Sequence, residues 1–293
     1  MTGIWGIVNV TPDSFSDGGR YLDPARAIEH ALGLWREGAT VLDVGGESTR
    51  PGADRVDPAL EQERVLPVIA ALAAQGAPVS IDTLNASTAV AAVEAGARIV
   101  NDVSGGLADE RMLSAVAPTG ADYALGHWRG PSADMYAHAE YRRVAREVAG
   151  ELREGVARAA AAGIAPSRII LDPGIGFAKA GDQNWDVLRG LDEITALGQR
   201  VLIGTSRKRF LVETLRRAQG TGERAQGTDA ADTSLPGGAE RDGGRPDGVS
   251  QGRRDLATAV TSALAARAGV WAVRVHDVAA TRDALAVARA WEG

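Results

Sequence analysis

The chain has 293 residues, 45% of them hydrophobic, which suits one α/β barrel or two ordinary domains with a sizeable core. A formal net charge of −6 at pH 7 argues against general nucleic-acid affinity, and the absence of cysteine excludes disulfides and thiolate metal sites. Because the sequence contains neither a run of about eighteen apolar residues nor a basic leader, it predicts a cytoplasmic protein that does not enter a membrane.

Short runs rich in β-branched residues recur along the chain, at Ile4–Val8, Thr40–Val44, Pro78–Ile81, Arg98–Val100, Asp122–Leu125, Arg168–Leu171, Arg200–Ile203 and Trp271–Val275. Longer stretches with helical spacing lie between them, for example at Pro24–Glu37, Pro58–Gln75, Ala86–Ala95, Tyr141–Ala162 and Leu256–Ala268. Apolar strands that alternate with helices indicate a parallel sheet covered on both faces. This pattern favours a closed (β/α)₈ (TIM) barrel over an open sheet, with residues 1–293 forming a single domain.

The segment Gly220–Gly252 is rich in Gly, and Leu235 and Val249 are its only large apolar residues. It cannot bury enough apolar surface to offset its ordering entropy, so we expect a disordered insertion after the seventh strand. Such an insertion is tolerated because the entropy of loop closure grows slowly with length. A neutral insertion and a mobile lid are both compatible with this composition.

In a barrel of this kind the active site forms at the carboxyl ends of the strands. Polar side chains follow every predicted strand: Asn9, Asp43, Asp82, Asn101 with Asp102, His127 with Arg129, Asp172, Ser206 with Lys208, and Arg274 with His276 and Asp277. A single Asp in such a place is often only a helix cap. Polar groups at all the strand ends indicate a site, because buried carboxylates are costly unless they are paired.

Cationic side chains follow strands two, seven and eight, which become neighbours when the barrel closes: Arg50, Arg207, Lys208, Arg274 and His276. The loops after strands seven and eight often bind phosphate, so this group predicts an anion site. Ser206 is placed to cap the helix that follows it, whose free N–H groups also favour an anion. For Arg207 and Arg209, ordinary surface charge is an equally good interpretation.

Asp82, Asn101 and Asp172 follow strands three, four and six. A carboxylate accepts two neighbouring N–H donors, and an amide offers one donor and one acceptor. The set therefore suits a flat heterocycle such as a pterin. The same residues also suit a hard cation, and the residues alone leave both interpretations open.

Eight motifs extend in order through the chain outside the insertion: NVTPDSFSDGG, DVGGESTRPG, SIDT, NDVSGG, HWRG, LDPGIGFAK, GTSRKRF and RVHDV. With these motifs the sequence resembles the dihydropteroate synthase family, whose members are (β/α)₈ barrels. The resemblance implies a transferase of folate biosynthesis that is a sulfonamide target. Such an enzyme condenses 6-hydroxymethyl-7,8-dihydropterin pyrophosphate with p-aminobenzoate and yields 7,8-dihydropteroate and pyrophosphate. A homodimer, and no nucleic-acid or membrane partner, are also implied.

The resemblance further implies the roles of individual residues. Pterin contacts are expected from Asp82, Asn101, Asp172, Phe177 and Lys208. Pyrophosphate contacts are expected from Thr49, Arg50, Arg274 and His276, and p-aminobenzoate contacts from Phe15, Asp17, Pro51 and Ser206. Asp82, Asp172, Lys208 and Asp17 are the implied catalytic residues, and Mg²⁺ is the implied cofactor with Asn9 as its contact.

The stretch NVTPDSFSDGG is long and polar for a connection between a strand and a helix. We interpret it as a lid over the leaving group and the incoming amine, with Phe15 against the aromatic ring and Asp17 near the amine. A slack loop with Phe15 in the core is the alternative.

Two positions depart from the family pattern. Gly126 stands where Met is frequent, which predicts looser or shifted packing of the pterin, and Arg209 stands where many relatives have Ser. The second change leaves the p-aminobenzoate carboxylate to Ser206 and the helix N-terminus. Three rival interpretations are a pterin-binding methyltransferase domain that acts with a corrinoid, a paralogue that binds pterin without turnover, and a synthase made insensitive to sulfonamides by altered loops. The first has no need for STRP, SRK and RVHD together.

Overall fold

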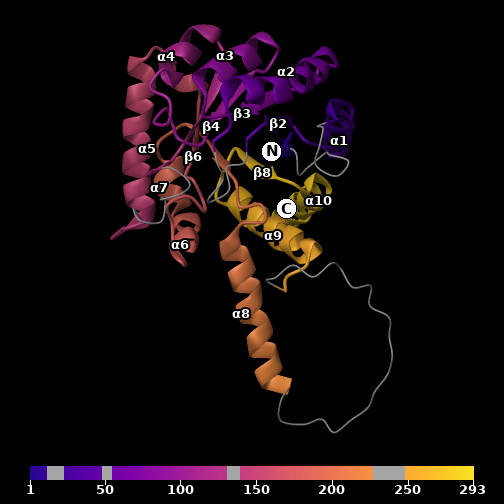
Figure 1. Ribbon diagram of the computed structural model, residues 1–293. Helices are drawn as coiled ribbons and strands as arrows, with labels where there is room; N and C mark the ends of the chain where they lie inside the picture. Colours follow the sequence, from indigo (N-terminus) through magenta and orange to yellow (C-terminus); the bar gives the residue numbers. More distant parts are fainter. Residues whose placement is uncertain (12–22, 48–54, 131–138, 227–247) are drawn as a thin grey trace.

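The computed structural model describes residues 1–11, 23–47, 55–130, 139–226 and 248–293. All the predicted strands are present: β1 Gly3–Asn9, β2 Val41–Gly45, β3 Val79–Asp82, β4 Ile99–Asp102, β5 Asp122–Gly126, β6 Ile169–Asp172, β7 Arg200–Ile203 and β8 Ala272–Val275. Neighbouring strands pair in parallel, and β1 pairs with β8, so that they close a barrel in sequence order. The predicted (β/α)₈ barrel is confirmed (Figure 1).

Helices surround this barrel: α1 Pro24–Glu37, α2 Pro58–Ala74, α3 Ala86–Glu94, α4 Met112–Val116, α5 Val144–Ala161, α6 Gln183–Arg189, α7 Leu191–Thr195, α8 Arg209–Gln226, α9 Gln251–Arg267 and α10 Val278–Glu292. Single 3₁₀ turns lie at Ala117–Thr119 and Pro166–Arg168. An Asp-Pro pair starts both α1 and α2, because the Asp side chain caps the helix while Pro suits its first turn. No helix in the described part of the chain is long and apolar enough to cross a membrane.

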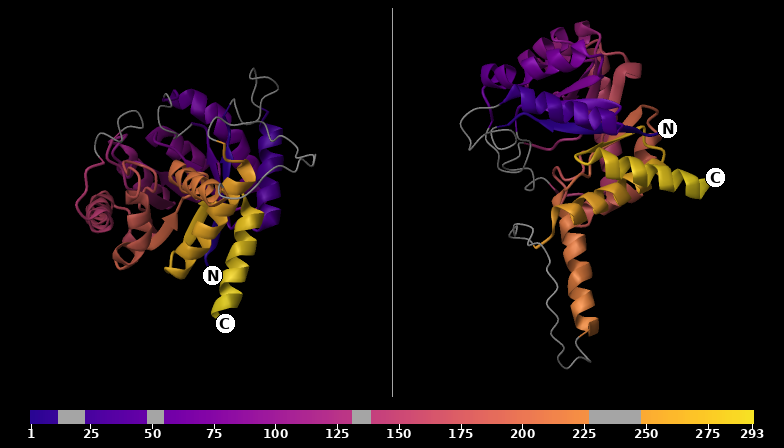
Figure 2. Two further views of the ribbon diagram at one scale, coloured as in Figure 1. Left: turned by 90° about the horizontal axis from the view of Figure 1, so that it is seen from below. Right: turned by 90° about the vertical axis from the view of Figure 1, so that its right-hand side faces the viewer.

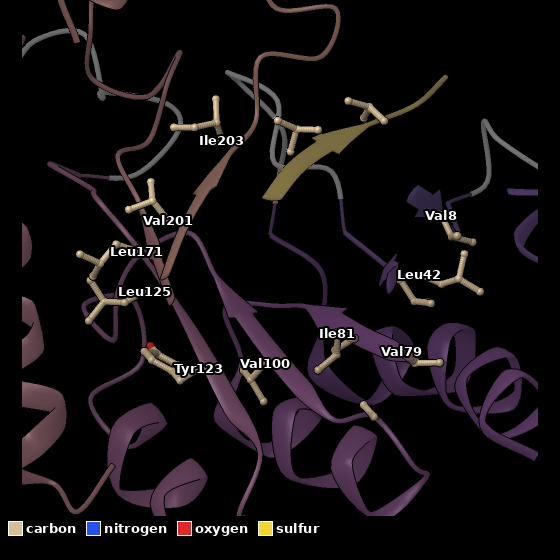
Figure 3. Close-up of a cluster of buried hydrophobic side chains, with 14 of the residues drawn as sticks. Val8, Leu42, Val79, Ile81, Val100, Tyr123, Leu125, Leu171, Val201 and Ile203 are labelled. Carbon is tan, nitrogen blue, oxygen red and sulfur yellow. The ribbon is translucent and has the colours of Figure 1, made fainter. Parts of the chain in front are cut away.

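The residues of each strand point alternately to two different cores. The outward set packs between the strands and the helices, as the labelled side chains from Val8 to Ile203 show in Figure 3. The inward set begins with an apolar layer inside the barrel, formed by Trp5, Val41, Ile99, Ala124, Ile170, Leu202 and Ala272. This layer closes the interior below the carboxyl ends of the strands.

The next inward position lies two residues further along each strand. Beyond Val41, Ile99, Ile170 and Ala272 of the apolar layer, these positions hold four polar residues: Asp43, Asn101, Asp172 and Arg274. Strand alternation therefore places the predicted site residues directly above an apolar floor.

The two ends of the predicted insertion belong to helices. Helix α8 continues to Gln226, and it stands out from the barrel in Figures 1 and 2. On the other side, Val249 is buried, and Ser250 caps α9 by accepting a hydrogen bond from the backbone N–H of Arg253. The stretch between them, residues 227–247, lies outside the described residues.

Candidate active site

Arg274 joins two carboxylates from neighbouring strands directly above the apolar floor of the barrel. Its Nε donates to Asp43 Oδ2, and its Nη2 donates to Asp82 Oδ2 at 2.6 Å. Asn101 adds a third contact, because its Nδ2 donates to the same Oδ2 of Asp43 at 3.0 Å. Arg274 and Asn101 thus meet at Asp43, and Asp82 is joined to them through Arg274.

Burial raises the pKa of Asp82 to about 7, a shift that the Arg274 charge opposes and the nearby Asp43 carboxylate reinforces. Asp82 therefore changes charge near neutral pH. In its ionised form it is an acceptor for two N–H donors of a ligand.

Asp172 and Lys208 approach the same space from β6 and from the loop after β7. A Cβ atom at Gly204 would lie 3.9 Å from Asp172 Oδ2, 3.8 Å from Lys208 Nζ and 3.9 Å from the Cβ of Arg274. The missing side chain of Gly204 therefore leaves these three groups around one small region. Burial raises the pKa of Asp172, and the Lys208 charge opposes this shift.

Lys208 is held by the loop that follows β6. Its Nζ donates to the backbone oxygen of Ile175 and lies 4.7 Å from the ring centroid of Phe177. A Cβ at Gly176 would lie 2.9 Å from Lys208 Cδ, so a side chain at this position would force the lysine stem to shift, and the positive φ of 84° also favours glycine here. Burial lowers the pKa of Lys208 to about 8, and the Asp172 carboxylate opposes this shift.

Ser206 and His276 form a pair beside this group. Ser206 Oγ accepts the backbone N–H of His276 at 3.1 Å and lies 2.8 Å from His276 Nδ1. Which of these two atoms carries the shared proton depends on the tautomer of His276. Ser206 is thus hydrogen-bonded to His276, and the cap on the next helix stays a prediction.

The two arginines that flank Lys208 have different environments. Arg207 donates to both carboxylate oxygens of Asp255 in α9, at 2.6 and 3.0 Å, so it is a bidentate ion pair rather than free surface charge. Arg209 has 80% of its side chain exposed and pairs with Glu213 one helical turn later. The surface-charge interpretation is thus confirmed for Arg209 and wrong for Arg207.

Three other strand-end residues lie outside the inner face. Asp102 points outward, where its carboxylate accepts from Tyr123 Oη at 2.7 Å and from Ser104 Oγ at 2.6 Å. Asp277 caps α10 by accepting the backbone N–H of Ala280 at 2.9 Å. His127 contacts Glu151 and Lys179. These residues shape the loops around the site.

The sequence interpretation missed Lys179, although it lies in the LDPGIGFAK motif. Only 1% of this lysine is exposed, and its Nζ donates to the backbone oxygens of Gly174 and Phe177, each at 3.0 Å. A lysine in a Gly-rich motif beside a strand end was the available signal. It holds the loop that carries Phe177.

Gly126 has no room for a side chain. A Cβ there would lie 2.4 Å from the backbone oxygen of Val103 and 2.5 Å from its Cα, so the chain after β4 occupies that space. From the sequence we expected Gly126 only to reduce the contact with the pterin. In the structure, the backbone of Val103 occupies the space that a side chain at this position would need.

Asn9 ends β1 beside Gly45 and offers an amide oxygen, which is a hard ligand. Among the described residues there is no cluster of three His, Cys, Asp or Glu side chains that could hold a metal ion by itself. Asn9 fits Mg²⁺, since this ion is commonly bound by few protein ligands together with substrate phosphates. The other predicted contacts, Phe15, Asp17, Thr49, Arg50 and Pro51, lie outside the described residues.

Comparison with known proteins agrees with this geometry. A family model described as pterin binding enzyme matches residues 5–276. The dihydropteroate synthase of Mycobacterium leprae (strain TN) is 51% identical over 287 residues, which cover 98% of this chain and 92% of the relative. That of Bacillus subtilis (strain 168) is 43% identical over 225 residues, which cover 75% of this chain and 76% of the relative.

Solved structures give the same result. The Xanthomonas albilineans dihydropteroate synthase with 4-aminobenzoic acid has a TM-score of 0.82 and 39% identity, covering 100% of this chain and 93% of that one. The Yersinia pestis enzyme in complex with a sulfonamide drug has a TM-score of 0.83 and 32% identity, covering 99% of this chain and 94% of that one. Fold and site thus define a pterin-binding barrel enzyme. The chain belongs to the pterin-binding enzyme family and, within it, to the dihydropteroate synthases.

Proposed function

We infer that the chain condenses 6-hydroxymethyl-7,8-dihydropterin pyrophosphate with p-aminobenzoate and releases pyrophosphate. The observation that carries this inference is the convergence of the buried Asp82 and Asn101 and the partly buried Asp172 with Lys208 and Arg274 above one apolar floor. A Xanthomonas albilineans relative has been solved in complex with 7,8-dihydropteroate, the product of such a reaction.

Recognition of the pterin rests on the hydrogen-bond acceptors that lie above this apolar floor. The carboxylates of Asp82 and Asp172 can accept N–H groups of the ring and its exocyclic amine, and Asn101 can accept through Oδ1. Phe177, which is half-buried beside Lys208, provides an aromatic face. A site built from buried acceptors discriminates strongly against rings that lack the matching donors.

The chemical step needs stabilisation of a leaving anion. Pyrophosphate departs from a methylene group on an electron-rich dihydropterin, so the carbon can acquire cationic character that is delocalised into the ring. The aromatic amine then attacks that carbon, and no covalent enzyme intermediate is required. Lys208, Arg274 and His276 stabilise the departing charge, while Asp82 and Asp172 stabilise the electron-poor ring.

Two further assignments concern Mg²⁺ and p-aminobenzoate. Asn9 would hold Mg²⁺ together with the substrate phosphates, and the ion would supply positive charge against the departing pyrophosphate. Ser206 is the proposed p-aminobenzoate contact, through a hydroxyl that it shares with His276. Competition by sulfonamides at this position, and a location in the cytoplasm, belong to the same proposal.

The test is pyrophosphate release by the purified protein with dihydropterin pyrophosphate, Mg²⁺ and p-aminobenzoate. We expect release that requires p-aminobenzoate and is lost in Lys208→Ala. Arg209→Ala is the matched control, because this neighbouring cation is exposed and should leave the rate unchanged. Pterin binding by calorimetry without any release would instead identify a binding paralogue.

We also propose a homodimer that forms through α9. This helix buries polar side chains such as Asp255, Thr258 and Thr261, while Leu256, Val260 and Leu264 are 64%, 50% and 55% exposed. The three exposed residues follow one another at intervals of four, so they form one apolar stripe along the helix. A second copy of the chain is the occupant that would bury such a stripe.

A further inference from the structure

Asp43 is a fully buried carboxylate in the barrel interior, with 0% of its surface exposed. It lies two residues beyond Val41 of the apolar layer and therefore on the same inner face of β2. A single oxygen, Oδ2, accepts hydrogen bonds from Arg274 Nε and from Asn101 Nδ2. This atom connects a residue proposed to bind pyrophosphate with a residue proposed to bind pterin.

The contact decides which end of the Asn101 amide is available to a ligand. An ionised carboxylate can only accept hydrogen bonds, so Asn101 must turn Nδ2 toward Asp43. Its oxygen, Oδ1, is thereby left to accept an N–H group. Without the carboxylate the amide could rotate by half a turn, and a donor would then stand where the pterin needs an acceptor.

The same carboxylate orients Arg274. A guanidinium is planar and carries five N–H bonds in a fixed arrangement. Contacts to Asp43 through Nε and to Asp82 through Nη2 fix its plane from two neighbouring strands. The remaining N–H bonds of the group then have a fixed direction in which to meet an anion.

The hydrogen bonding of Asp43 itself is incomplete. Its second oxygen, Oδ1, is buried and has no hydrogen-bond partner among the described residues. An unsatisfied buried acceptor costs free energy, so the hydrogen bonding of this carboxylate is not optimal for stability. The two hydrogen bonds that Oδ2 accepts both come from residues of the proposed site, Arg274 and Asn101.

We propose that Asp43 is a positioning residue for both halves of the pterin pyrophosphate: it sets the orientation of the Asn101 amide and of the Arg274 guanidinium. The inference rests on the proposed function, since it names the same substrate. It assigns Asp43 no direct contact with that substrate.

The test is Asp43→Asn, which keeps the shape of the side chain and adds a competing N–H donor. We expect the dissociation constants of 6-hydroxymethylpterin and of inorganic pyrophosphate, measured by calorimetry, each to rise about tenfold or more. In an Asn101→Ala background the same substitution should no longer change pterin affinity, while its effect on pyrophosphate should remain. A merely structural role would weaken pterin binding equally in both backgrounds, and that result would overturn the proposal.

Ser80→Ala is the matched control. Ser80 is the β3 residue in register with Asp43, is fully buried, and its Oγ has no hydrogen-bond partner among the described residues. Both affinities should be unchanged in this variant. If Asp43→Asn fails to fold, Asp43→Ser provides the same comparison with a smaller side chain. Unchanged affinities in a folded Asp43 variant would refute the inference, whereas wild-type protein that binds pterin without turnover would refute only the proposed reaction.

Discussion

Lys179 Nζ lies 3.0 Å from His127 Nδ1, in a part of the barrel where both side chains are almost completely buried. The other ring nitrogen, Nε2, lies 2.9 Å from Glu151 Oε2. The partners define the tautomer: Nε2 carries the proton and donates it to Glu151, while Nδ1 accepts from Lys179. The HWRG and LDPGIGFAK motifs are thereby joined through a neutral histidine.

This arrangement predicts a loss of stability in mild acid. Burial lowers the pKa of His127 from 6.5 to about 4, and the Lys179 charge reinforces the shift. Between these values the unfolded chain binds a proton that the native protein does not, so the free energy of unfolding falls as the pH decreases from 6.5 to 4. Urea unfolding at several pH values should show this slope, and His127→Asn should flatten it. Parallel slopes in the two proteins would contradict the assignment.

The raised pKa of Asp82 predicts how activity declines toward acidic pH. Because its pKa is raised to about 7, protonation below that pH removes the acceptor on which pterin binding depends. We expect kcat/KM to decline as the pH falls below about 7. Asp82→Asn should lower kcat/KM by about 10- to 100-fold, the range for a hydrogen bond to a charged group, and should abolish the limb. An unchanged acidic limb in this variant would exclude Asp82 as its origin.

Lys208 predicts the alkaline limb. Its pKa is lowered to about 8 by burial, so the ammonium that faces the substrate anion is lost as the pH rises above that value. Activity should decline above about pH 8 in the wild type. Lys208→Arg retains its charge at high pH and should keep whatever activity it has without this decline. If the decline persists in Lys208→Arg, another group controls the limb.

Much of the fold and of the site follows from periodicity in the sequence. The strands were predictable because each is a short apolar run, and Asp82, Asn101 and Asp172 were predictable because strand ends converge on one rim. The pairings were not predictable. Arg274 meets Asp43 across 231 residues of chain and His127 meets Lys179 across 52, and no local pattern specifies which buried charges are neighbours. Strand alternation also distinguishes the inward Asn101 from the outward Asp102, but it can be applied only when the register of the strand is known.

The apolar stripe of α9 predicts the oligomeric state. If a second copy covers it, the double substitution Leu256→Glu and Leu264→Glu should convert a dimer to a monomer in sedimentation experiments, because charges would have to be buried at the interface. Leu60→Glu is the control, since Leu60 is 43% exposed on α2, on the far side of the barrel in Figure 1. A wild-type protein that sediments as a monomer at micromolar concentration would contradict the proposed interface.

The close approach of the Val103 backbone to Gly126 predicts that a side chain at this position destabilises the protein. Gly126→Ala places a methyl group where the Val103 backbone lies 2.4 to 2.6 Å away, and backbone cannot move aside as a flexible side chain can. We expect this substitution to reduce the free energy of unfolding by about 1–3 kcal/mol, the range for overpacking. Gly150→Ala is the matched control: Gly150 lies within α5, a Cβ there would meet nothing within 4 Å, and alanine should stabilise the helix by about 0.5–1 kcal/mol. Urea unfolding of the two variants should therefore give shifts of opposite sign. Equal stability of Gly126→Ala and the wild type would mean that the chain after β4 yields, and that a side chain such as Met can be accommodated at this position.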